Sequence, residues 1–196
     1  MRVRDEEKVQ LVKQKALESL VKDGFEGFSM NKLAKACGIS VATLYIYYKD
    51  KDDLIISIAN EEGEKMAAAM IENFTPSLSF EEGMRIQWQN RYAYVVTNPL
   101  AYQFFEQLRT SSYQVKFLET FMKKFKIVIS EFMHNVVARG EMNPMPLEVF
   151  WSVAYAPLYS LLRFDREGQS VGGKPFKMTE EILWQTFDLV IKALKN

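Results

Sequence analysis

The segment that decides the fold runs from Ser29 to Leu54 and reads SMNKLAKACGISVATLYIYYKDKDDL. Its pattern predicts a short helix, a tight turn, a second short helix and the start of a third, all within one small apolar unit. Ser29 and Ser40 stand where helix N-caps are expected, and Gly38 stands where the turn requires a positive φ. This layout is typical of a helix-turn-helix, which places its second helix in the major groove of DNA.

The second helix of this motif carries an outer surface that is mostly apolar. Leu44 and Tyr48 are four residues apart and are predicted to face the core. Methyl groups on the other faces would suit thymine methyls, and hydroxyls would reach bases or phosphates. The outward or sideways positions are Val41, Ala42, Thr43, Tyr45, Ile46 and Tyr47. The alternative interpretation is an ordinary pair of helices in which Tyr45 and Tyr47 belong to a core.

The same segment resembles the DNA-binding signature of the TetR family of bacterial transcriptional regulators. The matching residues are Gly38-Ile39-Ser40, Thr43-Leu44-Tyr45, Tyr48 and the run from Lys51 to Leu54. In the family, the positions of Thr43, Tyr45, Tyr47 and Lys51 typically meet DNA, and the N-cap at Ser29 often touches a phosphate. The residues predicted to contact DNA are Ser29, Lys35, Ser40, Val41, Ala42, Thr43, Tyr45, Tyr47, Lys49 and Lys51.

Two positions depart from the family pattern at the leading edge of the reading helix. Val41 stands where the family often has a basic residue, and Ala42 stands where it often has glycine. Both departures remove hydrogen-bonding capacity and favour apolar readout. We therefore hypothesise a preference for A·T-rich steps in the DNA target.

Charge and cysteine content restrict the remaining function classes. The 196 residues contain 25 basic and 25 acidic side chains, and residues 1–54 contain 10 basic and 9 acidic ones, a net charge of +1. This balance argues against strong non-specific binding to DNA, but not against specific binding. The single cysteine, Cys37, excludes a disulfide framework and a zinc cluster. With no apolar run of membrane-spanning length and no signal-peptide pattern, a cytoplasmic protein without a membrane partner is expected.

The whole chain is predicted to be helical, with about nine helices. Residues 1–54 would form a three-helix DNA-binding domain, and residues 55–196 would form a larger helical bundle that binds ligand and dimerises. Pro157 lies inside an expected helix and predicts a kink or break there. The further predicted helices cover residues 5–22, 50–73, from 80, from 99, from 111 or 112 to 139, 147–166 and 180–194.

Aromatic side chains at helical spacing dominate the second domain. They build either a core alone or a core with a cavity for an apolar or aromatic ligand. The family resemblance implies such a cavity, and Gln87, Arg91, Gln107, His134 and Asn135 are polar groups that would orient a ligand. His134 is the only histidine, so we expect no metal site and no cofactor. The predicted ligand-binding residues are Trp88, Arg91, Tyr92, Phe105, Phe117, Phe121, His134, Trp151 and Tyr155.

Two segments near the C-terminus have wide apolar surfaces. Residues 149–162 are uncharged throughout, and the last predicted helix has a broad apolar face. The resemblance implies that these helices form a four-helix interface between two copies of the chain. The predicted interface residues are Val153, Leu158, Leu161, Leu183, Phe187, Val190 and Ile191.

The sequence and the resemblance together predict a homodimeric, ligand-responsive regulator of transcription. Its partners would be a double-stranded DNA operator and a small-molecule effector. In the family, the empty dimer holds the operator, and the fourth helix transmits the effect of ligand to the spacing of the DNA-binding heads. Two alternatives are a helix-turn-helix module that acts through protein partners and an enzyme that uses the bundle cavity. No catalytic motif supports the enzyme.

Overall fold

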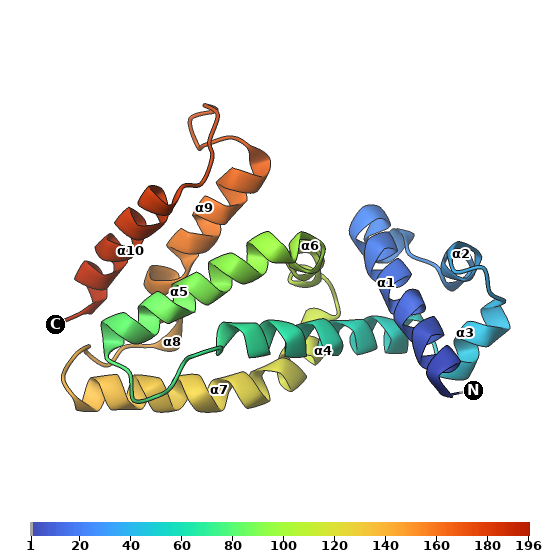
Figure 1. Cartoon of the computed structure of the whole chain (residues 1–196), viewed down its shortest axis with the longest axis horizontal. Coiled ribbons are helices and arrows are strands. Elements are labelled where there is room, and N and C mark those ends of the chain that lie inside the picture. Colours follow the sequence, from blue (N-terminus) through green and yellow to red (C-terminus); the bar gives the residue numbers. More distant parts are fainter. Residues whose placement is uncertain (1) are drawn as a thin grey trace. The chain divides into compact units, whose positions relative to one another are not determined.

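The computed structural model describes the backbone of residues 2–196 and the side chains of residues 6–119 and 127–196. Within the described backbone it contains ten α-helices and no strand, which confirms the all-α prediction (Figure 1). The chain divides into two compact units. We call Met1–Ala67 with Asn98–Lys123 the head unit, and Ala68–Thr97 with Lys124–Asn196 the bundle unit.

Four helices lie in each unit, and two further helices contribute residues to both units. The head unit holds α1 (Arg2–Gly27), α2 (Met30–Ala36), α3 (Val41–Tyr47) and α6 (Pro99–Leu108). The bundle unit holds α5 (Phe80–Thr97), α8 (Leu147–Ala154), α9 (Ala156–Glu167) and α10 (Glu180–Leu194). The helices shared by residue range are α4 (Lys51–Met70) and α7 (Gln114–Ala138).

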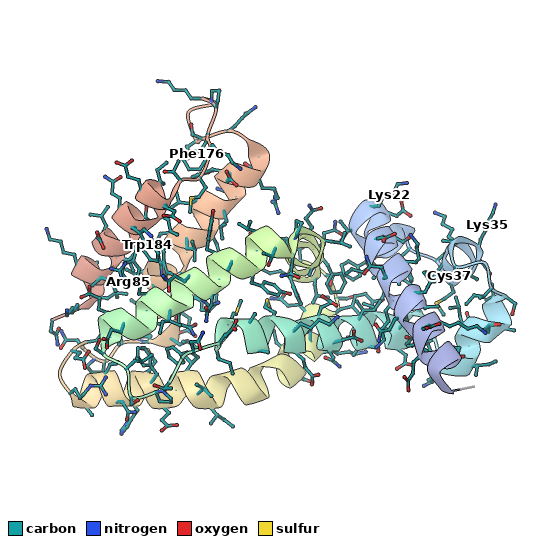
Figure 2. The ribbon with its side chains drawn as sticks, in the orientation of Figure 1. Lys22, Lys35, Cys37, Arg85, Phe176 and Trp184 are labelled. Atoms are coloured by element: carbon teal, nitrogen blue, oxygen red, sulfur yellow. The ribbon has the colours of Figure 1, made fainter. Side chains whose placement is uncertain are left out.

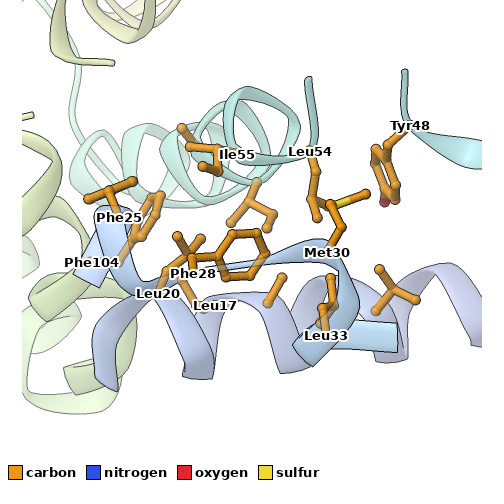
Figure 3. Packing of buried hydrophobic residues seen from close by; sticks show 14 of the residues in the cluster. Leu17, Leu20, Phe25, Phe28, Met30, Leu33, Tyr48, Leu54, Ile55 and Phe104 are labelled. Carbon is orange, nitrogen blue, oxygen red and sulfur yellow. The ribbon is translucent and has the colours of Figure 1, made fainter. Parts of the chain in front are cut away.

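The core of the head unit forms around the break in α1. Gly24, where the sequence predicts the first helix to stop, has a φ of 72°, and one more helical turn follows it. This break directs Phe25 and Phe28 into the same core as Leu20, Leu33 and Leu54 (Figure 3). A residue with a side chain rarely adopts this φ, so glycine permits the change of direction.

Helix α6 and the segment after it pack into the head unit. Phe104 and Leu108 are buried in its core, and Gln107 donates from Nε2 to the carbonyl oxygen of Val21 at 2.9 Å. Tyr113 donates its phenol proton to Oδ1 of Asp52 at 2.6 Å. Burial, followed by this hydrogen bond, raises the pKa of Tyr113. Gln107 therefore holds α6 to α1, and its predicted role in orienting a ligand stays a prediction.

Helix α4 ends at Met70, three residues earlier than the sequence predicts. The chain leaves the helix through short turns, in which the N–H of Glu72 bonds to Ala69 and that of Phe74 bonds to Ile71. Asn73 has a φ of 55°, a left-handed conformation that ends helical hydrogen bonding. The helix therefore ends in local turns before Pro76 is reached.

A break between α8 and α9 explains why there are ten helices in the described backbone rather than about nine. The sequence predicts one helix over 147–166, but α8 ends at Ala154 and α9 begins at Ala156. Pro157 lies in the first turn of α9, where its missing N–H costs no hydrogen bond. The predicted break at this proline is confirmed.

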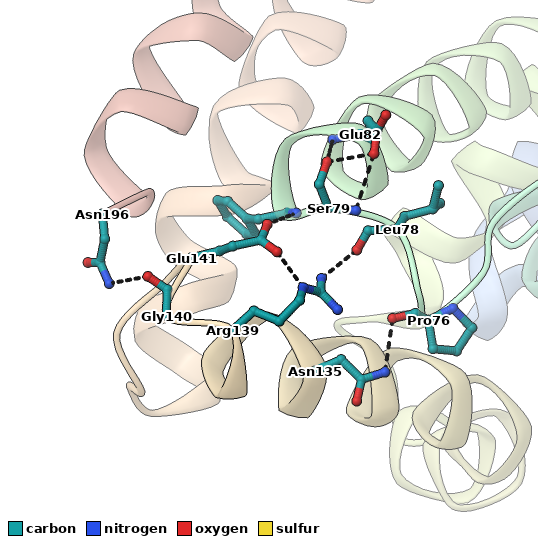
Figure 4. A network of polar contacts seen from close by, with 10 residues as sticks. Pro76, Leu78, Ser79, Glu82, Asn135, Arg139, Gly140, Glu141 and Asn196 are labelled. Atoms are coloured by element: carbon teal, nitrogen blue, oxygen red, sulfur yellow. Dashed lines mark hydrogen bonds and ion pairs between the residues drawn. The ribbon is translucent and has the colours of Figure 1, made fainter.

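A polar network fixes the start of α5 in the bundle unit (Figure 4). The hydroxyl of Ser79 and the carboxylate of Glu82 form a capping box. Glu141 accepts a hydrogen bond from the N–H of Phe80, which lowers the pKa of its carboxyl group, and it also pairs with Arg139. Asn135 donates to the carbonyl oxygen of Pro76 at 3.0 Å. Asn135 therefore holds the loop before α5, and its predicted ligand role stays a prediction.

The connection between α9 and α10 is a short hairpin. Gln169 and Pro175 form a single antiparallel bridge, and the N–H of Ser170 bonds to the carbonyl oxygen of Lys174 at 2.8 Å. In α5, the guanidinium of Arg85 lies 4.8 Å from the ring centroid of Trp184 on α10, and the two are seen together in Figure 2. Across the described residues, no helix combines the length and apolar character needed to cross a membrane.

Candidate nucleic-acid interface and buried arginine centre

Two serine caps and one glycine turn shape the pair α2 and α3. Oγ of Ser29 accepts from the N–H of Lys32 at 3.2 Å, and Oγ of Ser40 accepts from the N–H of Thr43 at 3.1 Å. Between the helices, Gly38 has a φ of 65°. All three predicted features of the helix-turn-helix are confirmed. The two serines accept hydrogen bonds from free N–H groups at the helix starts, and the glycine allows the chain to turn between the helices.

Helix α3 presents an apolar surface to solvent. Leu44 is 0% exposed and, with the buried Tyr48, anchors the helix on the head core. Tyr45 is 52% exposed and Ile46 is 77% exposed. Val41 and Tyr47 are half-buried and pack sideways against the core. One face of α3 packs on the core, and the other exposes apolar side chains to solvent. Such side chains can contact thymine methyl groups in the major groove of DNA.

Ile46 is missing from the predicted set of DNA-contacting residues, although its side chain is more exposed than that of Tyr45. The signal that identifies it is the inward pair Leu44 and Tyr48. A helical wheel anchored on that pair places residue 46 outward. Ala42 and Ser40 are also exposed, and Thr43 is half-buried with its hydroxyl 2.8 Å from that of Ser40.

The three lysines of the predicted interface occupy different environments. Lys35 is exposed on α2 (Figure 2), and Lys49 is exposed after α3. The half-buried Lys51 instead donates from Nζ to the carbonyl oxygen of Phe25 at 2.6 Å and lies 5.9 Å from the ring centroid of Phe28. Its ammonium group therefore joins α4 to the end of α1, and its predicted contact with DNA stays a prediction.

A second site lies in the bundle unit, around Arg91 of α5. Arg91 is only 1% exposed. Nη1 donates to the phenol oxygen of Tyr159 at 3.0 Å and to Sδ of Met70 at 3.2 Å, and Nη2 donates to Oε1 of Gln87 at 3.2 Å. We call the set Met70, Gln87, Arg91, Trp151, Tyr155 and Tyr159 the Arg91 centre.

Aromatic rings surround the guanidinium of this centre. Its carbon lies 4.1 Å from the ring centroid of Tyr155 and 5.5 Å from that of Trp151. Burial works to lower the pKa of Arg91, but the phenols of Tyr159 and Tyr155 outweigh it and the pKa is raised. Burial raises the pKa of the Tyr155 phenol. The arginine therefore keeps its charge, and Tyr155 keeps its proton.

Within the bundle unit, the structure brings together four of the residues predicted to bind ligand. Arg91, Trp151 and Tyr155 belong to the Arg91 centre, and Trp88 donates from Nε1 to the carbonyl oxygen of Ala154 at 2.9 Å, next to it. Phe105 and Phe117 pack together in the head unit, with ring centroids 5.3 Å apart. Tyr92 is half-buried on the bundle core, His134 is exposed on α7, and Phe121 lies outside the described side chains.

His134 is therefore not among the residues that contact Arg91 within the bundle unit, and the ligand roles of Phe105 and Phe117 stay predictions. Phe105 and Phe117 satisfy the core of another unit, and the exposed ring of His134 faces solvent. Tyr159 contacts Arg91 but is missing from the predicted residues, and Gln87, predicted only as a group that would orient a ligand, contacts Arg91 as well. Their spacing was available as a signal, since Gln87 and Arg91, like Tyr155 and Tyr159, are four residues apart on one helix face or flank.

The residues predicted for a dimer interface divide into an inner and an outer group. Val153 and Leu161 are half-buried, and Leu189 is an exposed neighbour on α10. The side chains that pack inside the bundle unit are those of Leu158, Leu183, Phe187, Val190 and Ile191. Intrachain packing covers these five side chains, and their predicted role in a dimer interface stays a prediction.

The exposed α3 on its capped scaffold defines a DNA-binding protein of the helix-turn-helix class. Residues 14–58 match the family model of bacterial regulatory proteins, tetR family. The fold over the whole chain is that of a TetR family transcription regulator from Marinobacter aquaeolei, with a TM-score of 0.85 and 23% identity over 100% of both chains. On these matches, residues 14–58 resemble the DNA-binding segment of the tetR family, and the chain as a whole has the fold of this solved regulator.

Two relatives match the N-terminal part in sequence. One is an uncharacterised HTH-type transcriptional regulator of Haemophilus influenzae, 30% identical over 80 residues, which is 41% of this chain and 43% of the relative. The other is a fatty acid metabolism regulator protein of Bacillus subtilis, 27% identical over 71 residues, which is 36% of this chain and 37% of the relative. The chain therefore aligns with less than half the length of each.

Proposed function

We propose that the protein is a homodimeric transcriptional repressor that leaves its operator when a small apolar or aromatic ligand binds. Residues 1–54 would bind DNA, and residues 55–196 would bind the ligand and form the dimer. The observation that carries this proposal is the outward apolar face of α3, with Tyr45 and Ile46 exposed and Leu44 buried beneath them.

The low positive charge of the DNA-binding segment is the reason why the proposal includes a dimer. A head segment with a net charge of +1 gains little from phosphates alone, so one head binds weakly. Two heads on one dimer reach two half-sites about 34–36 Å apart, or a multiple of that, and their affinities combine. Exposed Leu189 on α10 and half-buried Leu161 on α9 supply apolar surface for such a dimer.

A ligand acts only if it binds one conformer of the dimer better than the other. The aromatic bundle unit suits an apolar ligand, and one relative is named for the regulation of fatty acid metabolism. Cells with such a repressor would express the target genes only when the ligand is present.

A mobility-shift assay on the DNA upstream of the protein's own gene tests the proposal. Specific binding that weakens between two salt concentrations is expected. Tyr45→Ala should reduce this binding about tenfold, and Val171→Ala, a change at a more exposed apolar residue in the α9–α10 hairpin, should not. If the protein binds no upstream fragment under any salt condition, a module that acts through protein partners takes the repressor's place.

Light scattering at several concentrations tests the dimer. Leu189→Lys places a charge on the exposed face of α10 and should shift the mass from two chains towards one. Val171→Lys adds the same charge in the hairpin and serves as the control. If Leu189→Lys remains a dimer, the interface lies on another face of the bundle unit.

A further inference from the structure

The Arg91 centre contains one hydrogen bond that a ligand can improve. A guanidinium presents its N–H groups in a plane, and a thioether sulfur is a weak acceptor for them. Nη1 of Arg91 donates to Sδ of Met70 at 3.2 Å, while the phenol oxygen of Tyr159 and the amide oxygen of Gln87 are stronger acceptors for the same guanidinium. Replacing the thioether by a negatively charged oxygen would strengthen this bond considerably.

We propose that the Arg91 centre binds the carboxylate of an apolar acid, and that the carboxylate displaces Sδ of Met70 from Nη1. This inference rests on the proposed function, since it names the chemical class of the effector. Low-dielectric surroundings favour it, because a buried cation attracts an anion more strongly than an exposed one. The ring faces of Tyr155 and Trp151 supply an apolar lining for the rest of the molecule.

Trp151 is the part of the centre that reaches solvent. Its side chain is 43% exposed, and its ring stacks on that of Tyr159 with centroids 6.3 Å apart and planes 17° from parallel. The guanidinium lies beneath this pair, since it contacts both residues. An acid would reach Arg91 by displacing the stacked pair, and binding would change the surroundings of the Trp151 indole.

The displaced group belongs to the last residue of α4. Besides the thioether contact, Nε2 of Gln87 donates to the carbonyl oxygen of Met70 at 2.7 Å, and Nδ2 of Asn90 donates to the same oxygen at 3.2 Å. Helix α5 therefore holds the end of α4 by its backbone and by its side chain. The acid would remove the side-chain contact and leave the backbone contact, so the end of α4 becomes the element whose conformers the acid discriminates.

A matched pair of ligand series tests the carboxylate directly. The full chain is titrated by calorimetry and tryptophan fluorescence with straight-chain acids from hexanoate to hexadecanoate and with the 1-alkanols of equal length. At least one acid should bind, and its alcohol should bind at least about tenfold more weakly. Equal binding of acid and alcohol, or no binding by any acid in the series, overturns the proposal.

Three variants assign the effect to the centre. Arg91→Gln should lose the preference for acid over alcohol. Met70→Leu removes the competing acceptor at similar volume, so its affinity for the acid should rise about threefold or more, with no change for the alcohol. Met84→Leu, the same change at a buried position of α5, should alter neither affinity. Unchanged acid binding in Met70→Leu overturns the displacement step even if Arg91→Gln fails to fold.

Trp151→Phe separates the Trp151 signal from those of Trp88 and Trp184, and should remove most of the fluorescence change while keeping the calorimetric binding. These assays contain no DNA, so their outcome is independent of the mobility shift. Release of DNA by neutral ligands alone would overturn this inference and leave the repressor intact. Acid-selective binding by a protein that binds no DNA would support this inference and overturn the repressor.

Discussion

The head unit and the bundle unit place charge and apolar surface in opposite ways. On α3, the apolar side chains of Tyr45 and Ile46 lie in solvent, where they contribute little to folding. On α5, the charged side chain of Arg91 lies inside the unit, where it costs desolvation energy. Each arrangement departs from the rule that apolar groups are buried and charges exposed. Such departures are expected where a surface or a cavity serves binding.

The largest effect is expected from removing the buried charge. Arg91→Ala leaves a cavity and takes a donor from Gln87 and Tyr159, so the free energy of unfolding should fall by about 3–5 kcal/mol. Urea denaturation measures the change. Arg163→Ala removes an exposed arginine from α9 and should change the free energy by less than about 0.5 kcal/mol. Equal effects of the two substitutions would show that burial of Arg91 has no structural consequence.

The head unit has a buried polar group of its own, the phenol of Tyr48. The hydroxyl has no hydrogen-bond partner among the described residues, and burial, assisted by Glu61 and Asp53, raises its pKa to about 12. The unfolded chain loses this proton near pH 10, so stability present below pH 10 is lost as the pH rises through 12. The expected loss is about 2 kcal/mol.

Tyr48→Phe should remove this part of the pH dependence and leave the variant at least as stable as the parent at pH 7. Chemical denaturation from pH 8 to pH 12 measures it, with Tyr45→Phe as a control that removes an exposed phenol. A parallel pH profile for Tyr48→Phe and the parent would mean that another group dominates the alkaline transition.

The exposed apolar face of α3 gives the reverse pattern, an effect on binding without an effect on folding. Ile46→Ala should weaken operator binding about tenfold, since it removes methyl contacts in the groove. The free energy of unfolding should stay within about 0.5 kcal/mol of the parent value. Fluorescence anisotropy with operator DNA and urea denaturation are measured on the same preparation. A clear loss of stability would show that Ile46 belongs to the fold rather than to the reading surface.

The sequence predicts the helix ends of the head closely because each depends on a few local residues. Ser29, Ser40 and Gly38 act within one turn, so their roles can be read without knowing the tertiary structure. The break before Pro157 was predictable for the same reason. The end of α4 was not, because it depends on the left-handed conformation of Asn73, which nothing in the local sequence demands.

The Arg91 centre is harder to predict because its contacts are long-range. Arg91 is 68 residues from Tyr159 and 21 from Met70 along the chain, and helical spacing cannot tell which aromatic stripe meets α5. For the same reason, Phe105 and Phe117 were predicted to bind ligand, although in the structure they pack with the core of the head unit. Periodicity identified the buried faces of α8 to α10 but not whether this chain or a partner covers them.

Ser40 combines a role in folding with a place on the predicted DNA-binding surface, since its hydroxyl caps α3 and the residue is exposed. Ser40→Ala should cost about 1 kcal/mol of unfolding free energy through loss of the cap. Ser40→Asp keeps an oxygen acceptor for the N–H of Thr43 and should keep the stability, while its negative charge repels operator phosphates. Thermal melts and anisotropy separate the two outcomes.

Thr179 supplies the matched control, because it caps α10 through the N–H of Ile182 at 3.3 Å and lies in the bundle unit. Thr179→Ala should lose a similar stability, and Thr179→Asp should leave operator binding unchanged. If Ser40→Asp also binds the operator normally, Ser40 serves only the fold, and the DNA-facing surface of α3 begins further along the helix. If only Ser40→Asp loses the operator, the reading surface starts at the cap itself.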